Sequence, residues 1–189
     1  MTIKAVVRAY IKEIRPHAQA ELDWFRRQLT LDSAIRQAAF AVNSQGRRYS
    51  HQRRLRQTSL IQARQALLAN SKSIEQRKSF DDLFDLIDAI LRPISGIGEL
   101  YIYDTSLRIG AKLNLLSTKV YLHSGTRVGA KALGFESKAK TLEVSALPKD
   151  LQQLEPHEIE DVLCIFNASF KEASPQIVVR DSSDRSWCC

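Results

Sequence analysis

The chain has 189 residues, of which 44% are hydrophobic and 26% charged, proportions that fit a globular protein and exclude wholesale disorder. Seven glycines and five prolines are too few for a collagen-like or low-complexity chain. No apolar run reaches the ~18–20 residues of a membrane-spanning helix, and the first residues do not resemble a signal peptide. Three cysteines, two of which are the terminal Cys188 and Cys189, do not make a disulfide framework. We therefore expect a cytoplasmic protein without a membrane anchor.

Charge is distributed unevenly along the chain. Residues 1–78 contain 16 Lys and Arg against 5 Asp and Glu, a balance of +11. Residues 79–189 contain 12 against 16, a balance of −4, so the net charge is +7. A basic half attracts polyanions, of which nucleic acid is the commonest. Ordinary solvation of a modest charge excess is the alternative explanation.

Apolar residues recur at helical spacing through most of the chain, and this predicts an all-α fold. We expect helices over residues 3–14 and 18–29, separated near Pro16 because proline resists helix continuation. Ser33 is a candidate cap for the start of a third helix, and Gly46 is a candidate for its end.

A fourth helix is expected from about residue 51 to residue 69, and the densest basic stretch of the chain leads into it. This stretch, residues 47–56, holds five arginines: Arg47, Arg48, Arg53, Arg54 and Arg56. Guanidinium groups suit phosphate oxygens, and the interleaved Tyr49 and His51 could stack on bases. Because arginines at a helix start oppose the helix dipole, some other reason is needed for them. We expect them to contact DNA; an acidic protein partner, bound by a structural subunit, is the alternative.

Two later helices have clear signals. Ser79 and Asp82 form a candidate capping box before a helix whose apolar stripe continues to Leu91. The last clear helix follows Pro156 and carries a stripe that we expect in the core: Ile159, Val162, Leu163, Phe166 and Phe170. The sequence thus predicts a single helical domain over residues 1–172, with basic N-terminal helices over 1–78, a core over 79–172 and a polar tail over 173–189.

The most informative stretch follows the helix that ends near residue 91. Residues 94–98 read Ile-Ser-Gly-Ile-Gly, and another helix is expected to begin beside Gly98. Glycines at 96 and 98 permit a tight reversal and let a phosphate reach the N–H groups at the start of that helix. Ile97 would anchor the turn in the core. The stretch resembles the helix-hairpin-helix motif, which implies that Gly96, Ile97 and Gly98 hold a DNA phosphate; a plain helical corner is the alternative.

A second resemblance lies farther along the chain. Six residues match, in order, the segment after the hairpin in the endonuclease III-like DNA glycosylases: Val120, His123, Arg127, Val128, Leu133 and Gly134. The resemblance covers residues 80–170 and implies a compact all-α domain with a central helix-hairpin-helix element. It also implies double-stranded DNA as the partner, with Arg127 among the residues that contact it.

The residues that carry out base excision in that family are not matched. Its catalytic aspartate falls at Tyr121 in this sequence, and the lysine nucleophile of its bifunctional members falls at Leu100. We expect no metal and no cofactor, because the histidines are scattered and the cysteines of the family's iron–sulfur cluster have no counterpart. Asp104 and His123 are the candidates if an enzyme has relocated its acid, although Asp104 is also spaced to pair with Arg108. We therefore expect a DNA-binding protein without glycosylase activity.

Overall fold

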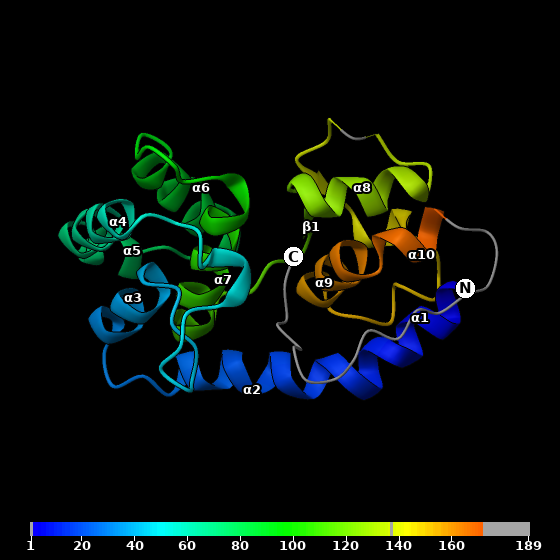
Figure 1. Cartoon of the computed structure of the whole chain (residues 1–189), viewed down its shortest axis with the longest axis horizontal. Helices are drawn as coiled ribbons and strands as arrows, with labels where there is room; N and C mark the ends of the chain where they lie inside the picture. The colour runs from blue at the N-terminus through cyan, green and yellow to red at the C-terminus, as the bar shows by residue number, and fades with distance from the viewer. Residues whose placement is uncertain (1, 137, 172–189) are drawn as a thin grey trace. The chain divides into compact units, whose positions relative to one another are not determined.

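The computed structural model describes residues 2–136 and 138–171 (Figure 1), and the chain divides into two compact units. The central unit consists of Ala18–Ser117, and the terminal unit joins the first 17 residues to the chain from Thr118 onward. The polar tail expected over 173–189 lies outside the described residues.

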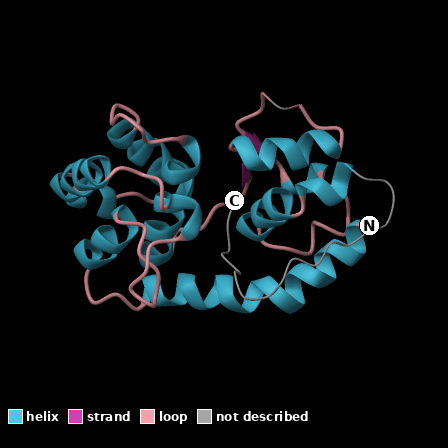
Figure 2. Cartoon of the chain, viewed as in Figure 1, coloured by secondary structure: helices cyan, strands magenta, loops and turns pink. Residues whose placement is uncertain are grey.

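The fold is all-α, as the sequence predicts (Figure 2). Helices make up most of the described chain, and the strands β1 (Val120–Tyr121) and β2 (Thr141–Leu142) pair in antiparallel orientation. Within residues 2–136 and 138–171, every helix is too short or too polar to cross a membrane.

The first helices continue through the proline that was expected to separate them. α1 (Ile3–Ala9) leads into a π-helical turn (Tyr10–Ile14), and α2 (Arg15–Arg26) follows without a break. In an α-helix, proline removes a hydrogen bond and its ring crowds the carbonyl of the preceding turn. The wider π turn, in which the Arg15 N–H donates to the Tyr10 carbonyl, removes that conflict. The prediction of a break at Pro16 was therefore wrong.

The third helix, α3 (Leu31–Ala39), begins with a different cap from the one expected. Thr30 is the N-cap, and Ser33 completes the capping box from inside the helix. The helix ends before residue 42, since Ala41 adopts a left-handed conformation with φ of 52°. Gly46, with φ of +72°, lies in the turn that follows and does not end the helix.

The fourth helix, α4 (Gln57–Ala69), starts later than the sequence indicated. A short 3-10 turn (Ser50–Gln52) precedes it, and Arg56 is its N-cap residue. Arg53 and Arg54 therefore lie before the helix and not in its first turns. This placement avoids several cations inside the positive end of the helix dipole. α5 (Ser71–Glu75) follows directly.

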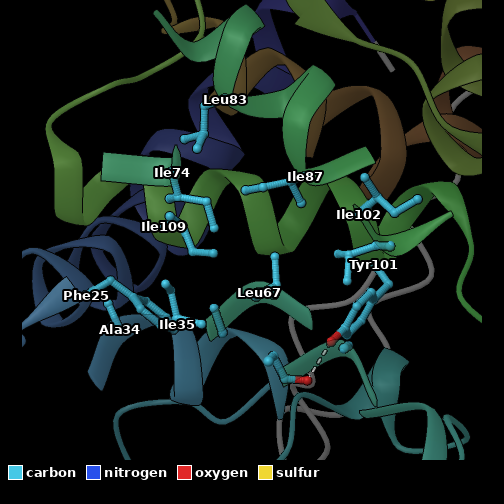
Figure 3. Close-up of a cluster of buried hydrophobic side chains, with 14 of the residues drawn as sticks. Phe25, Ala34, Ile35, Leu67, Ile74, Leu83, Ile87, Tyr101, Ile102 and Ile109 are labelled. Atoms are coloured by element: carbon cyan, nitrogen blue, oxygen red, sulfur yellow. Dashed lines mark hydrogen bonds between the residues drawn. The ribbon is translucent and has the colours of Figure 1, made fainter. Parts of the chain in front are cut away.

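The core of the central unit forms where α3 and α6 (Phe80–Leu91) pack against α7 (Glu99–Leu113) and α4 packs against α3 and α6. Ser79 caps α6 by accepting a hydrogen bond from the Asp82 N–H, as predicted. Figure 3 shows side chains from these helices and their neighbours meeting in one cluster, including Phe25, Ile35, Leu67, Ile74, Ile87, Ile102 and Ile109. Within this core, the Tyr101 hydroxyl donates a hydrogen bond to the Ala39 carbonyl at 2.5 Å. Burial raises the pKa of Tyr101 above its usual value, so the hydroxyl remains a donor.

The terminal unit is built on the contact between α8 (Ser124–Ala132) and α9 (Pro156–Ile165), with α10 (Asn167–Lys171) beside them. The stripe expected after Pro156 is buried at Ile159, Val162 and Leu163. α8 approaches α9 very closely at Gly129, where a Cβ atom would lie 2.1 Å from the Leu163 carbonyl oxygen. The two helices can pack at this distance only with glycine at position 129.

We predict that Gly129→Ala lowers the free energy of unfolding by about 1–3 kcal/mol, because backbone atoms of α9 must shift to admit the methyl group. This loss should outweigh the gain of about 1 kcal/mol in helix propensity. Urea denaturation of the purified variants measures the change. Lys131→Ala, an exposed position on the same helix, is the control. Equal stability of the two variants would contradict the close approach.

Candidate nucleic-acid interface

The loop between α6 and α7, here the hairpin loop (residues 92–98), is fixed against α4. Gly96 has φ of +83°, a left-handed conformation that favours glycine. The Ser59 hydroxyl, in the first turn of α4, donates to the Ser95 carbonyl at 2.7 Å. Ile97 is half-buried and packs against the central core, the position expected of an anchor. The backbone of Gly96, the packing of Ile97 and the bond to α4 together position the hairpin loop.

Gly98 is exposed at the start of α7. Its φ of −112° and ψ of 172° are available to any residue, and a Cβ atom there would meet nothing within 4 Å. Neither backbone conformation nor internal packing thus requires glycine at this position. Glycine has no side chain with which to cap the helix. Among the described residues, nothing fills the position of a Cβ atom at the start of α7.

The arginine segment (residues 47–56) leads into the same region of the central unit. Arg56 is the N-cap of α4 without a side-chain cap, and Ser59, three residues later, is bonded to the hairpin loop. The two stretches that the sequence analysis selected separately are therefore neighbours in the structure. Their link is the hydrogen bond between Ser59 and Ser95.

Most arginines of this segment face solvent. Four of them are exposed and make no ion pair with any residue that the structure describes: Arg47, Arg53, Arg54 and Arg56. Arg48 differs, because it is half-buried and donates to the Leu55 carbonyl and to Gln57 Oε1 at 2.8 Å. Residues 33–74 contain no Asp or Glu, so no acidic neighbour in the sequence offsets this charge.

The two aromatic rings of the arginine segment are used inside the unit. The Tyr49 hydroxyl donates to Glu21 Oε2 at 2.7 Å, and the Arg108 guanidinium lies over its ring at 4.0 Å. Burial raises the pKa of Tyr49 above its usual value, against the opposing effect of the Arg108 charge. His51 Nε2 lies 2.8 Å from Asp104 Oδ2. Base stacking, expected of Tyr49 and His51, does not fit these positions.

Asp104, one of the two candidate acids, is largely buried in this network. Its Oδ2 atom accepts hydrogen bonds from Gln52 Nε2 at 2.6 Å and from Arg108 at 3.2 Å. The pairing with Arg108 expected from the sequence is thereby confirmed. The carboxylate acts as a structural acceptor between the arginine segment and α7.

His123, the other candidate, belongs to the terminal unit. It is the N-cap residue of α8, only 2% exposed, and its Nε2 atom is bonded to Oε1 of the buried Glu160 on α9. Arg127, half-buried on α8, also belongs to this unit, whereas the other candidate DNA contacts belong to the central unit. Tyr121, at the position of the family's aspartate, is buried in β1.

Two further polar pairs of the terminal unit were missed by the sequence analysis. Arg15 binds Glu158 through two hydrogen bonds of 2.7 Å, and the Tyr10 hydroxyl donates to Asp161 at 2.9 Å. Both acidic residues lie between the apolar positions of α9, where a sequence pattern indicates solvent. Only the long-range partners reveal that Glu158 is buried and that Asp161, which is half-buried, accepts from Tyr10.

Comparison of the chain with models of protein families, with curated proteins and with solved structures found no match. The resemblance to the DNA glycosylases therefore rests on the matched residues alone and stays a prediction. In the part of the chain that the structure describes, no three His, Cys, Asp or Glu side chains are arranged to hold a metal ion.

We predict that Glu160→Ala destabilises the protein by about 3–5 kcal/mol, since it removes one member of a buried, hydrogen-bonded pair. Glu160→Gln should cost less, because its amide oxygen still accepts a hydrogen bond from the histidine ring. Chemical denaturation measures both changes. The control is Glu143→Ala, which removes only an exposed ion pair with Lys119. A loss at Glu160 no larger than at Glu143 would contradict the importance of the buried pair.

Proposed function

We propose that the central unit binds the phosphate backbone of double-stranded DNA, without catalysis, through the hairpin loop and the arginine segment. The observation that carries this proposal is the contact between Ser59 and Ser95, which joins the first turn of α4, directly after Arg56, to the loop before α7. Each of the two features suits phosphate on its own, and the proposal joins them in one binding surface. No cofactor is required.

Two helix starts and four exposed cations suit phosphate groups. The first N–H groups of α4 and α7 lack side-chain caps, and such groups, aided by the helix dipole, favour an anion. Glycine at position 98 lets a phosphate approach them closely. The exposed arginines would bind neighbouring phosphates and release counterions from the DNA. This release makes the free energy of binding more favourable at low salt.

The surface favours backbone contact over base recognition. Binding to single strands usually relies on aromatic rings on which bases stack. Tyr49 and His51 lie within the arginine segment, but their contacts with Glu21 and Asp104 hold them inside the unit. Contacts to phosphate position a protein on DNA without reading its sequence. We therefore propose a sequence-independent duplex binder.

Two alternatives are less well supported. An acidic protein could bind the same arginines, but it would make no use of the open space at Gly98. An enzyme with a relocated acid would need an accessible carboxylate, whereas Asp104 is engaged by the residues around it. Base excision develops positive charge on the sugar, and neither Tyr121 nor Leu100 supplies an anion or an amine to stabilise it.

We expect replacement of Arg53, Arg54 and Arg56 by Gln to weaken binding of a labelled duplex and to flatten its salt dependence. Each lost phosphate contact lowers the slope of log K against log salt by about 0.9, so the loss reaches about 2.7 for three contacts. Fluorescence anisotropy at several salt concentrations measures the slope.

A matched triple variant, with Arg27, Arg36 and Lys78 replaced by Gln, changes the net charge equally at exposed positions outside the arginine segment. It should keep the steep slope of the wild type. Equal slopes for the two triple variants would argue for non-specific attraction. A wild-type protein that binds no duplex at low salt would refute the proposed function.

Gly98→Val should weaken duplex binding by about 1–3 kcal/mol, because the side chain blocks the approach of phosphate to the N–H groups of α7. The fold should persist, since the backbone conformation suits valine, and circular dichroism checks this. Ser79→Val, at the start of α6, is the control for loss of helix-start stability. Unchanged affinity in Gly98→Val would remove the hairpin loop from the interface. Gly96 is unsuitable for this test, because its positive φ strains any replacement.

A further inference from the structure

The arginine segment has little regular structure of its own. It contains a short 3-10 turn (Ser50–Gln52), and further backbone hydrogen bonds lie at the bridge between Val42 and Arg48 and between the Leu55 N–H and the Gln52 carbonyl. A segment without a regular helix or strand loses conformational entropy when it is held in one shape, and these local bonds offset part of that loss. Contacts of its side chains add to the free energy that orders it.

Two side chains of α7 make those contacts. Asp104 Oδ2 accepts from Gln52 Nε2 at 2.6 Å and lies 2.8 Å from His51 Nε2. Arg108, one helical turn later, donates to Gln52 Oε1 at 3.0 Å and places its guanidinium 4.0 Å from the centre of the Tyr49 ring. Asp104 and Arg108 thus hold three residues of the segment, which are Tyr49, His51 and Gln52.

The hydrogen bonds of this network are largely buried, so their loss would be costly in free energy. Gln52 is 2% exposed and Arg108 is 6% exposed. If the hydrogen bond between them broke, little water would be near to bind the amide or the guanidinium. Hydrogen bonds to charged groups are stronger than neutral ones, and a buried charge that loses its partner is costly. Glu21 adds a second attachment, because its carboxylate accepts from the Tyr49 hydroxyl and from Ser44.

The inward residues fix where the arginines point. Tyr49, His51 and Gln52 face the unit, while Arg53 and Arg54, which follow directly, are exposed. Release of the inward side chains would free the exposed ones to sample many directions.

We propose that Asp104 and Arg108 are positioning residues that hold the arginine segment in the conformation that binds DNA. This inference rests on the proposed function of the central unit. Without the pair, only a fraction of molecules would present the arginines correctly, and the apparent affinity falls by that fraction. The number of phosphates contacted in the complex stays the same, so the salt slope does not change. This pattern differs from that of the arginine replacements, which lower the slope.

The first test is Asp104→Asn, which keeps the size of the side chain and removes the negative charge that faces Arg108. We expect faster amide hydrogen–deuterium exchange confined to residues 47–56, and roughly tenfold weaker duplex binding with the wild-type salt slope. Ile87→Val, in the core of the same unit, is the control for a general loss of stability. It should leave both the exchange in the segment and the affinity unchanged.

A rescue variant separates positioning from a general structural role. Combining Gln52→Glu with Asp104→Asn exchanges the carboxylate and the amide, so that Arg108 again faces a carboxylate and the hydrogen bond between the two positions re-forms in reverse. Exchange protection and affinity should both recover.

Several outcomes would overturn the inference. The first is that the Asp104→Asn variant binds the duplex with wild-type affinity, and the second is that its salt slope differs from that of the wild type. The third is that the double variant regains protection from amide exchange without regaining duplex affinity. Failure of the wild type to bind duplex would refute the proposed function and, with it, the positioning role. The exchange measurement would then report separately whether the pair orders the segment.

Discussion

The central unit depends on the burial of α7. Nine of its fifteen residues are buried, and they include polar side chains such as Thr105, Ser106 and Arg108. Apolar residues of the helix bind it to α3 and α6, while Asp104 and Arg108 attach the chain that precedes α4. Because Tyr101 and Ile102 of its first turn are buried, packing also holds the start of the helix, where Gly98 and Glu99 are exposed.

Much of the fold could be predicted from the sequence, because apolar residues at helical spacing indicate which face of a helix is buried. The cap at Ser79 and the stripe after Pro156 are local signals; the cap was confirmed, and the stripe is buried at Ile159, Val162 and Leu163 but only half-buried at Phe166 and Phe170. The start of α4 was misjudged, since it depends on the bonds of His51 and Gln52 to Asp104, about fifty residues away along the chain. A pattern of neighbouring residues does not indicate which distant residues will form such hydrogen bonds.

The candidate site was predictable only in its parts. Glycine spacing selected the hairpin loop, and charge density selected the arginine segment, but their proximity depends on a hydrogen bond between Ser59 and Ser95 that neither pattern encodes. The inward direction of Tyr49 was equally hidden, because a tyrosine among arginines has the same pattern whether it faces a base or a buried glutamate.

Both units hold carboxylates by basic groups of their own, as Arg108 holds Asp104 in the central unit. The central unit differs in its arginine segment, where four exposed arginines make no ion pair with a described residue. In the terminal unit, carboxylates of α9 are held by groups of the same unit, as Glu158 is by Arg15 and Glu160 by His123. Buried pairs of this kind add little net stability but penalise any packing that separates them.

The π turn at Tyr10–Ile14 has a geometric consequence for these pairs. In a regular α-helix of 3.6 residues per turn, side chains five positions apart point about 140° away from each other. A π turn closes over five residues, so it brings positions 10 and 15 to the same side. Both can then face α9, where their partners Asp161 and Glu158 are themselves three residues apart. The extra residue that accommodates Pro16 thus also aligns a hydroxyl and a guanidinium with two successive carboxylates.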